Sequence, residues 1–301
     1  MLQEHPEWGG MDLAAAPTVF ADLTAYLKLP LDRIVRQYWE QHDSNDAAAQ
    51  LRVAQASDEA TVLAYYAETP MYLYQLSFWE ATYDKQGWFR VLAAACRKHG
   101  LRRVLDFGGG VGGLTLFLHA HGIRCDYLDV PGKTFDYAAW RFAQRGQAVS
   151  LFHATQIDGQ PEHAYDAVIV WDVLEHLFDL EGAITDIVRL LRPGGWLISK
   201  STFAHGHGHD EHVHLAKHAC YSDVRQFDQL VAHAGFRYRG QLKPNRLSRA
   251  VQRLGLRRAV WGVRLAPRLK YGGNFLVHER ACGTAGRPRH GDLRHRVEHH
   301  P

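Results

Sequence analysis

Residues 104–113 read Val104-Leu-Asp-Phe-Gly-Gly-Gly-Val-Gly-Gly113, and the rest of the chain is organised around them. Their apolar start is typical of a buried parallel strand. The glycines that follow would let a ligand touch the backbone, and the apolar run from Leu114 predicts a helix whose first N–H groups attract electron-rich groups. The stretch therefore predicts a strand, a glycine turn and a helix N-terminus that together form a ligand-binding cradle.

Two classes of cofactor use such a turn. Gly108, Gly110 and Gly113 satisfy the G-x-G-x-x-G dinucleotide pattern, which any glycine-rich run matches easily. Asp106 is more informative, because a carboxylate at the strand end would repel a pyrophosphate and would suit the ammonium group of an amino acid. Asp129 ends the next apolar run, where a carboxylate can hold ribose hydroxyls. An amino-acid group joined to a ribose describes S-adenosylmethionine.

Three motifs carry a family resemblance. Val104–Gly113 resembles motif I of the class I S-adenosylmethionine-dependent methyltransferases, Tyr165–His176 resembles their fourth strand with its D-V-L-E-H ending, and Leu191–Ile198 resembles their L-x-P-G-G turn. The D-V-L-E-H form is similar to that of the small-molecule branch, which includes the ubiquinone-pathway O-methyltransferases. The resemblance covers about residues 100–240 and implies methyl transfer to an O or N atom of a small molecule, with a histidine removing the proton.

The order of apolar runs predicts an α/β fold. Alternating strands and helices favour a Rossmann-like, seven-stranded, mostly parallel sheet with right-handed crossovers and an antiparallel last strand at its edge. We expect strands at residues 102–107, 124–129, 147–153, 166–171, 196–202, 236–242 and 273–279.

Three segments surround or interrupt this core of residues 96–282. Residues 1–95 are expected to form a helical extension that acts as a substrate lid, in which Tyr72 and Tyr74 either line the acceptor pocket or simply pack the helices on the core. Residues 245–270 carry many arginines and no acid, which is typical of a packed helix with a solvated basic face or of a surface that contacts a membrane or an anionic partner. Residues 283–301 lack periodicity and are expected to be disordered.

The resemblance implies a set of cofactor-binding residues at the carboxyl ends of the first four strands: Asp106, Gly108, Gly110, Asp129, Val130, Ile157, Asp158, Trp171 and Asp172. Asp106 and the glycines would contact the methionine end, Asp129 the ribose and Val130 the adenine. The usual G-D-A sequence is absent around Asp158. Asp172 could instead cap the segment that follows it.

Histidines supply the candidate bases, since imidazole titrates near neutral pH. His176 follows the fourth strand, and its alternative role is to fix the loop with Glu175. His212 and His214 belong to a histidine-rich stretch after the fifth strand, where related methyltransferases often carry a His-Leu pair. This stretch also contains acids, so a divalent metal could bind there, although S-adenosylmethionine is the cofactor that we expect.

Composition excludes several other classes. A net charge of +3 over 301 residues does not indicate a nucleic-acid partner, and the strand-four ending lacks the motif of base-amino methyltransferases. Four scattered cysteines argue against a disulfide framework, and neither a signal peptide nor a membrane-spanning run is evident, so a cytoplasmic enzyme is expected. The alternatives are a metal-dependent enzyme that uses the histidine-rich stretch and a non-catalytic protein that binds S-adenosylmethionine.

Overall fold

The computed structural model describes residues 10–43, 53–201, 203, 215–222, 224–243 and 274–282. Within them, seven strands form one sheet in the order β3-β2-β1-β4-β5-β7-β6. The strands are β1 (Arg103–Phe107), β2 (Arg124–Asp129), β3 (Leu151–His153), β4 (Tyr165–Trp171), β5 (Leu191–Lys200), β6 (Phe236–Leu242) and β7 (Phe275–Arg280). The first five pair in parallel, so the predicted Rossmann-like sheet with an antiparallel last strand is confirmed.

The position expected for the last strand was wrong. β7 does not lie at the edge of the sheet but between β5 and β6, and it is antiparallel to both. The side chains of Phe275 and Val277 are buried, whereas the middle of β6 is exposed, including Tyr238. The apolar strand therefore takes the interior place, and the polar strand takes the edge, where one side of its ladder stays open to water.

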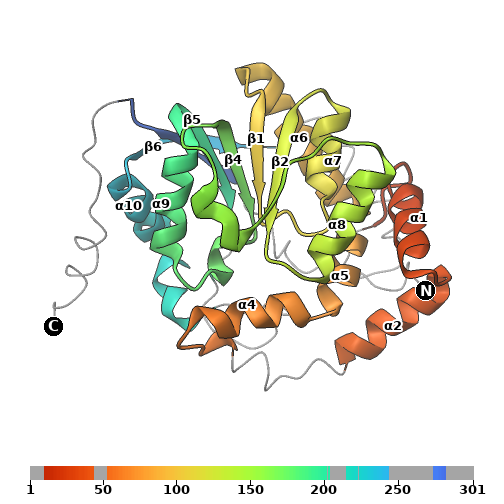
Figure 1. Cartoon of the computed structure of the whole chain (residues 1–301). Helices are drawn as coiled ribbons and strands as arrows, with labels where there is room; N and C mark the ends of the chain where they lie inside the picture. Colours follow the sequence, from red (N-terminus) through yellow and green to blue (C-terminus); the bar gives the residue numbers. More distant parts are fainter. Residues whose placement is uncertain are drawn as a thin grey trace, which may run out of the picture.

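Helices cover both faces of the sheet (Figure 1). One face carries α6 (Tyr83–His99), α7 (Gly113–Ala120) and α8 (Lys133–Gln144), which bury residues such as Leu92, Leu118 and Phe142 against it. The other face carries α9 (Leu180–Leu190) and α10 (Val224–His233), whose apolar residues pack on Leu105 and Phe107. Alternate residues of each strand thus enter opposite cores, as the two-residue period of a strand requires.

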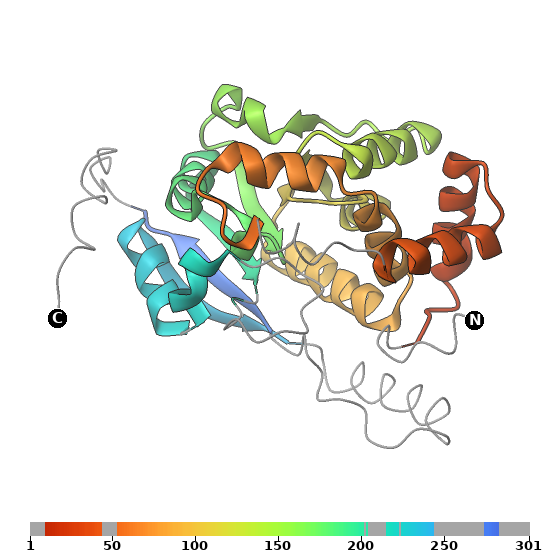
Figure 2. The same cartoon turned by 90° about the horizontal axis from the view of Figure 1, so that it is seen from below.

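The N-terminal helices lie outside these layers. They are α1 (Ala16–Leu27), α2 (Leu31–Asp43), α4 (Glu59–Glu68) and α5 (Met71–Glu80). α1, α2 and α5 share one apolar cluster with Tyr137 of α8, while α4 crosses beneath the sheet in Figure 1 and lies in front of it in the view from below (Figure 2). Helix α6 packs on the sheet through residues such as Phe89 and Leu92, and the boundary at residue 96 stays a prediction.

Several predictions lie outside the described residues. They concern the basic segment 245–270, the tail 283–301 and most of the histidine-rich stretch, with His212 and His214. Among the helices that the structure describes, none combines the length and the apolar character needed to span a membrane.

Candidate active site

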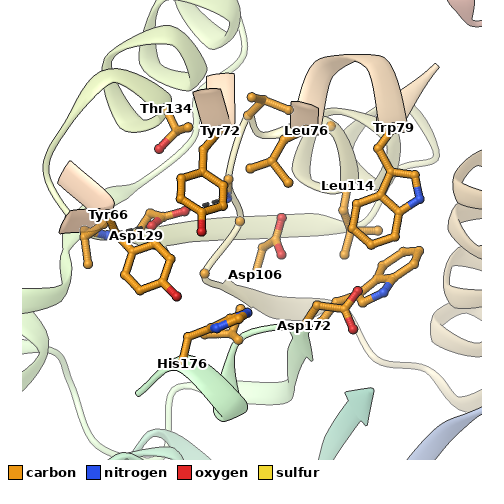
Figure 3. A pocket seen from close by; sticks show the side chains of 18 of the residues that line it. Tyr66, Tyr72, Leu76, Trp79, Asp106, Leu114, Asp129, Thr134, Asp172 and His176 are labelled. Atoms are coloured by element: carbon orange, nitrogen blue, oxygen red, sulfur yellow. Dashed lines mark hydrogen bonds between the residues drawn. The ribbon is translucent and has the colours of Figure 1, made fainter. Parts of the chain in front are cut away.

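A cavity of about 200 Å³ lies between the carboxyl ends of β1, β2 and β4 and the covering helices α4 and α5 (Figure 3). In Figure 3, Tyr72 and Leu76 project from α5 on one side and His176 lies opposite, with Asp106 and Asp129 between them. Nine of the residues predicted from the sequence line this cavity: Tyr72, Asp106, Gly108, Gly110, Asp129, Val130, Trp171, Asp172 and His176. The sheet topology therefore brings together residues that lie up to about a hundred positions apart in the chain.

The glycine-rich loop after β1 forms the floor of the cavity. Gly108 has φ +74°, and a Cβ there would lie 2.4 Å from a methyl carbon of Val173. Gly110 has φ +56°, and its Cβ would lie 2.9 Å from Leu76. Both positions combine a left-handed backbone with close neighbours, so glycine is required at each. This close packing gives the loop a defined shape on which a ligand can rest.

Asp129 closes the loop from the end of β2. One carboxylate oxygen accepts the Gly110 N–H at 2.5 Å and the other accepts the Val130 N–H at 2.7 Å. Burial raises the pKa of Asp129 to about 6, and the bond from Gly110 opposes that rise. The group is thus largely ionised at neutral pH. Each oxygen keeps acceptor capacity beyond its backbone bond, which suits a pair of neighbouring hydroxyls.

Asp106 is the second carboxylate on the floor. It is 4% exposed and accepts the Thr115 hydroxyl at 2.8 Å. Burial raises its pKa to about 6, and the hydrogen bond from Thr115 partly counteracts this. A buried carboxylate that is ionised at neutral pH favours a cation beside it.

Lys85, at the start of α6, was not predicted as a site residue. Its Nζ lies 3.3 Å from the ring centroid of Trp171 and 3.9 Å from that of Trp79, and it lines the cavity. Burial lowers the pKa of Lys85 to about 8, and the nearby Asp172 carboxylate opposes that change. No local pattern identifies this residue, because its partners belong to α5 and β4.

Asp172 follows β4 and has a left-handed backbone, with φ +51°. Its two carboxylate oxygens are shielded from solvent, and neither has a hydrogen-bond partner among the described residues. The same holds for the Nζ atom of Lys200, which is 4% exposed. Burial raises the pKa of Asp172 to about 7. The short helix η4 (Leu174–His176) begins after Val173, so Asp172 does not serve as its N-cap.

An aromatic wall faces these carboxylates. The Tyr66 ring lies 5.5 Å from the His176 ring and 5.3 Å from the Tyr72 ring. The buried Tyr72 hydroxyl has no hydrogen-bond partner among the described residues. Burial raises the pKa values of Tyr66 and Tyr72, so both phenols stay protonated and can donate a hydrogen bond.

Three other predicted residues lie away from the cavity. Tyr74 is two positions from Tyr72 on α5, so it projects from the opposite side, where its hydroxyl donates to Gln37 at 3.3 Å. Ile157 packs with the core cluster beneath α9, and Asp158 is exposed. Among the described residues, no group of three or more histidines, cysteines or acids is arranged to hold a metal.

A family model described as a methyltransferase domain matches residues 63–241, which is more than half of the chain. The chain belongs to this family. With the sheet order and the glycine-rich loop described above, it is a class I S-adenosylmethionine-dependent methyltransferase.

The chain spans less than half the length of the curated relatives described here. A lovastatin diketide synthase of Monascus pilosus is 34% identical over 119 residues, which are 36% of this chain and 5% of that protein. A ubiquinone biosynthesis O-methyltransferase of Aromatoleum aromaticum is 32% identical over 96 residues, 31% of this chain and 41% of that protein.

Among solved structures, a 1,6-didemethyltoxoflavin-N1-methyltransferase of Burkholderia thailandensis with bound S-adenosylhomocysteine aligns with a TM-score of 0.44 and 18% identity. The alignment covers 64% of this chain and 78% of that one.

Proposed function

We propose that the cavity binds S-adenosylmethionine along the ends of β1 and β2 and a small acceptor against α4, α5 and η4. The observation that carries this proposal is the pair of carboxylates, Asp106 and Asp129, on either side of a loop that only glycine can form. The pair would match a ligand with an ammonium group at one end and a diol at the other.

The residues present fit such a ligand. Asp129 would accept from the ribose hydroxyls, and Asp106 would face the ammonium group of the methionyl end. Lys85 lines the same cavity and bears on Asp106 electrostatically, so it would hold the methionyl carboxylate. The Asp172 carboxylate, which has no hydrogen-bond partner among the described residues, lies beside Lys85 and would hold the Lys85 ammonium group in place.

The cofactor supplies an electrophilic methyl group on a positively charged sulfur. The acceptor atom must be aligned with that methyl group and must lose any proton that it carries. His176 is the described residue best suited to take this proton, since it lines the cavity opposite the carboxylates and imidazole titrates near neutral pH. Tyr72 would orient the acceptor through its hydroxyl. His212 and His214 remain rival bases, and the acceptor atom is an oxygen or a nitrogen.

Calorimetric titration with S-adenosylhomocysteine tests the cofactor site. In Asp129→Asn, the loss of a charged acceptor for two hydroxyls should weaken binding by roughly 1.5–3 kcal/mol, on the order of tenfold to a hundredfold. Asp136→Asn is the matched control, because Asp136 is an exposed carboxylate seven positions further along the chain. The proposal fails if the wild-type protein does not bind at millimolar ligand, or if both variants bind equally well.

Substitution of the histidines tests the proton transfer. His176→Asn should lower kcat by about 10²–10⁴-fold, the contribution typical of a general base, and should leave the affinity for S-adenosylhomocysteine unchanged. The same measurement on His214→Asn ranks the rivals. Activity that survives loss of His176 but not of His214 would transfer the role of base. Loss of activity in a chelator without loss of cofactor binding would favour the metal-dependent alternative.

A further inference from the structure

Arg141 of α8 is a fully buried arginine that does not line the cavity. Its side chain is 2% exposed. Its two terminal nitrogens donate to the two carboxylate oxygens of Glu80 at 2.7 and 2.8 Å, and Nε donates to Asp22 at 3.0 Å. Glu80 ends α5 and Asp22 belongs to α1, so one guanidinium joins three helices that are distant in sequence.

The same guanidinium also reaches the glycine-rich loop. Nη1 donates to the carbonyl of Val111 at 2.6 Å. The preceding residue, Gly110, is held by two other side chains: its N–H donates to Asp129, and its carbonyl accepts the Tyr127 hydroxyl at 2.6 Å. The loop backbone is thus fastened on one side to the carboxylate that would bind ribose and on the other to the helical cover.

We propose that Arg141 is a positioning residue that couples the docking of α1 and α5 to the shape of the cofactor loop. The inference rests on the proposed binding of S-adenosylmethionine to this loop. If the cover loosens, Arg141 loses Glu80 and Asp22, and Val111 loses its donor. Gly110 then no longer presents its N–H to Asp129 in the same place. Cofactor affinity therefore depends in part on α1, which has no residue lining the cavity.

Coupling of this kind is reciprocal. If docking of the cover strengthens cofactor binding, then bound cofactor must stabilise the docked cover by the same free energy. A purely structural ion pair would lower stability when broken but would leave the affinity of the folded protein unchanged. The two roles are therefore distinguishable by measurement.

The first test needs no substitution. Backbone amides of α1, 12 residues that do not line the cavity, should exchange hydrogen more slowly when wild-type protein is saturated with S-adenosylhomocysteine. Unchanged exchange in α1 while the ligand is bound overturns the proposal. Absence of ligand binding would instead refute the cofactor site itself.

The second test compares two arginines of one helix region. Arg145 also pairs with Asp22 but has no bond to the loop. Arg141→Met should weaken S-adenosylhomocysteine binding by about tenfold, and Arg145→Met should leave it unchanged. The double variant Arg141→Met, Glu80→Met removes the uncompensated carboxylate and should recover stability without recovering affinity. Wild-type affinity in a folded Arg141→Met variant or in the double variant overturns the proposal. If Arg141→Met does not fold, Asp22→Asn replaces it, and its affinity for S-adenosylhomocysteine should fall by a smaller but measurable factor.

Discussion

Among the described residues, two of the groups of charged side chains that are shielded from water differ in how their hydrogen-bonding capacity is met. In the first, which we call the Arg141 cluster (Asp22, Glu80 and Arg141), the guanidinium meets two carboxylates and a backbone carbonyl. In the second, the Asp172 cluster (Lys85, Asp172 and Lys200), neither oxygen of Asp172 and no donor of Lys200 has a hydrogen-bond partner among the described residues.

This difference indicates a structural role for the Arg141 cluster and a ligand-binding role for the Asp172 cluster. A buried ion pair with all its bonds made holds elements in register, and removing one member leaves the other uncompensated. A buried charge without such bonds costs free energy in the folded protein unless a ligand compensates for it. In the Arg141 cluster only Glu80 reaches the wall of the cavity, and Asp22 and Arg141 lie behind the loop. In the Asp172 cluster both Lys85 and Asp172 line the cavity, where a ligand can reach them.

The largest expected effect is on stability. Arg141→Met should lower the free energy of unfolding by about 3–5 kcal/mol, because Glu80 remains buried without its cation, whereas Asp22 keeps Arg145. Lys200→Met in the Asp172 cluster should cost less than about 1 kcal/mol, since no hydrogen bond is lost. Urea unfolding of the ligand-free proteins measures both. Similar losses in the two variants would remove the distinction between the clusters.

The second effect is on ligand affinity and runs the other way. Lys85→Met should weaken binding of S-adenosylhomocysteine by about 1.5–3 kcal/mol, the range for a hydrogen bond to a charged group. Binding of methylthioadenosine, which lacks the amino-acid end, should not change. Calorimetry with both ligands gives the comparison. An equal loss for both ligands would mean that Lys85 shapes the cavity and does not bind the carboxylate.

The third effect is a dependence of affinity on pH. Asp106 and Asp129 have pKa values raised to about 6 by burial, so both become protonated as the pH falls from 7 to 5. Affinity for S-adenosylhomocysteine should fall by up to about tenfold for each group and each pH unit below 6, because the ligand needs the ionised forms. Methylthioadenosine has no ammonium group and should show a shallower fall. Titrations at pH 5, 6 and 7 decide this, and a flat profile would contradict it.

The smallest effect is on the stability of the ligand-free protein. The pKa of Asp172 is raised to about 7, so between its ordinary value and 7 the folded state binds the proton that the unfolded state has released. Its contribution to stability is present below about pH 4 and is lost as the pH rises through 7, by at most about 1.4 kcal/mol per pH unit. Asp172→Asn should reduce this slope in thermal unfolding between pH 4 and 8. An unchanged slope would assign it to other groups.

Much of the parallel sheet could be predicted from local pattern. The predicted strand 124–129 coincides with β2, and the predicted strand 102–107 contains β1. β3 is shorter than predicted, because only Leu151–His153 pair with β2 at this edge of the sheet. β5 begins at Leu191 and not at residue 196, since Leu191 still pairs with Tyr165 beyond an irregularity in the ladder.

Part of the site could be predicted in the same way. One strand–turn–helix–strand segment contains Asp106, Gly108, Gly110 and Asp129, and its motif can be recognised from the local sequence. The sequence does not distinguish Tyr74 from Tyr72, because both are aromatic residues of one helix. The rotation of that helix against the sheet decides which of them reaches the cavity.

Local sequence pattern accounts for most of the elements, their order and the chemistry of the glycine-rich loop, because these depend on residues close together in the chain. The tertiary packing, in contrast, places β7 between β5 and β6 and brings Lys85 to Trp171 and Asp172. The same packing lets Arg141 join α1 and α5 to Val111. Such contacts connect segments tens of residues apart, and their energies depend on burial and mutual distance, which no periodicity along a single chain encodes.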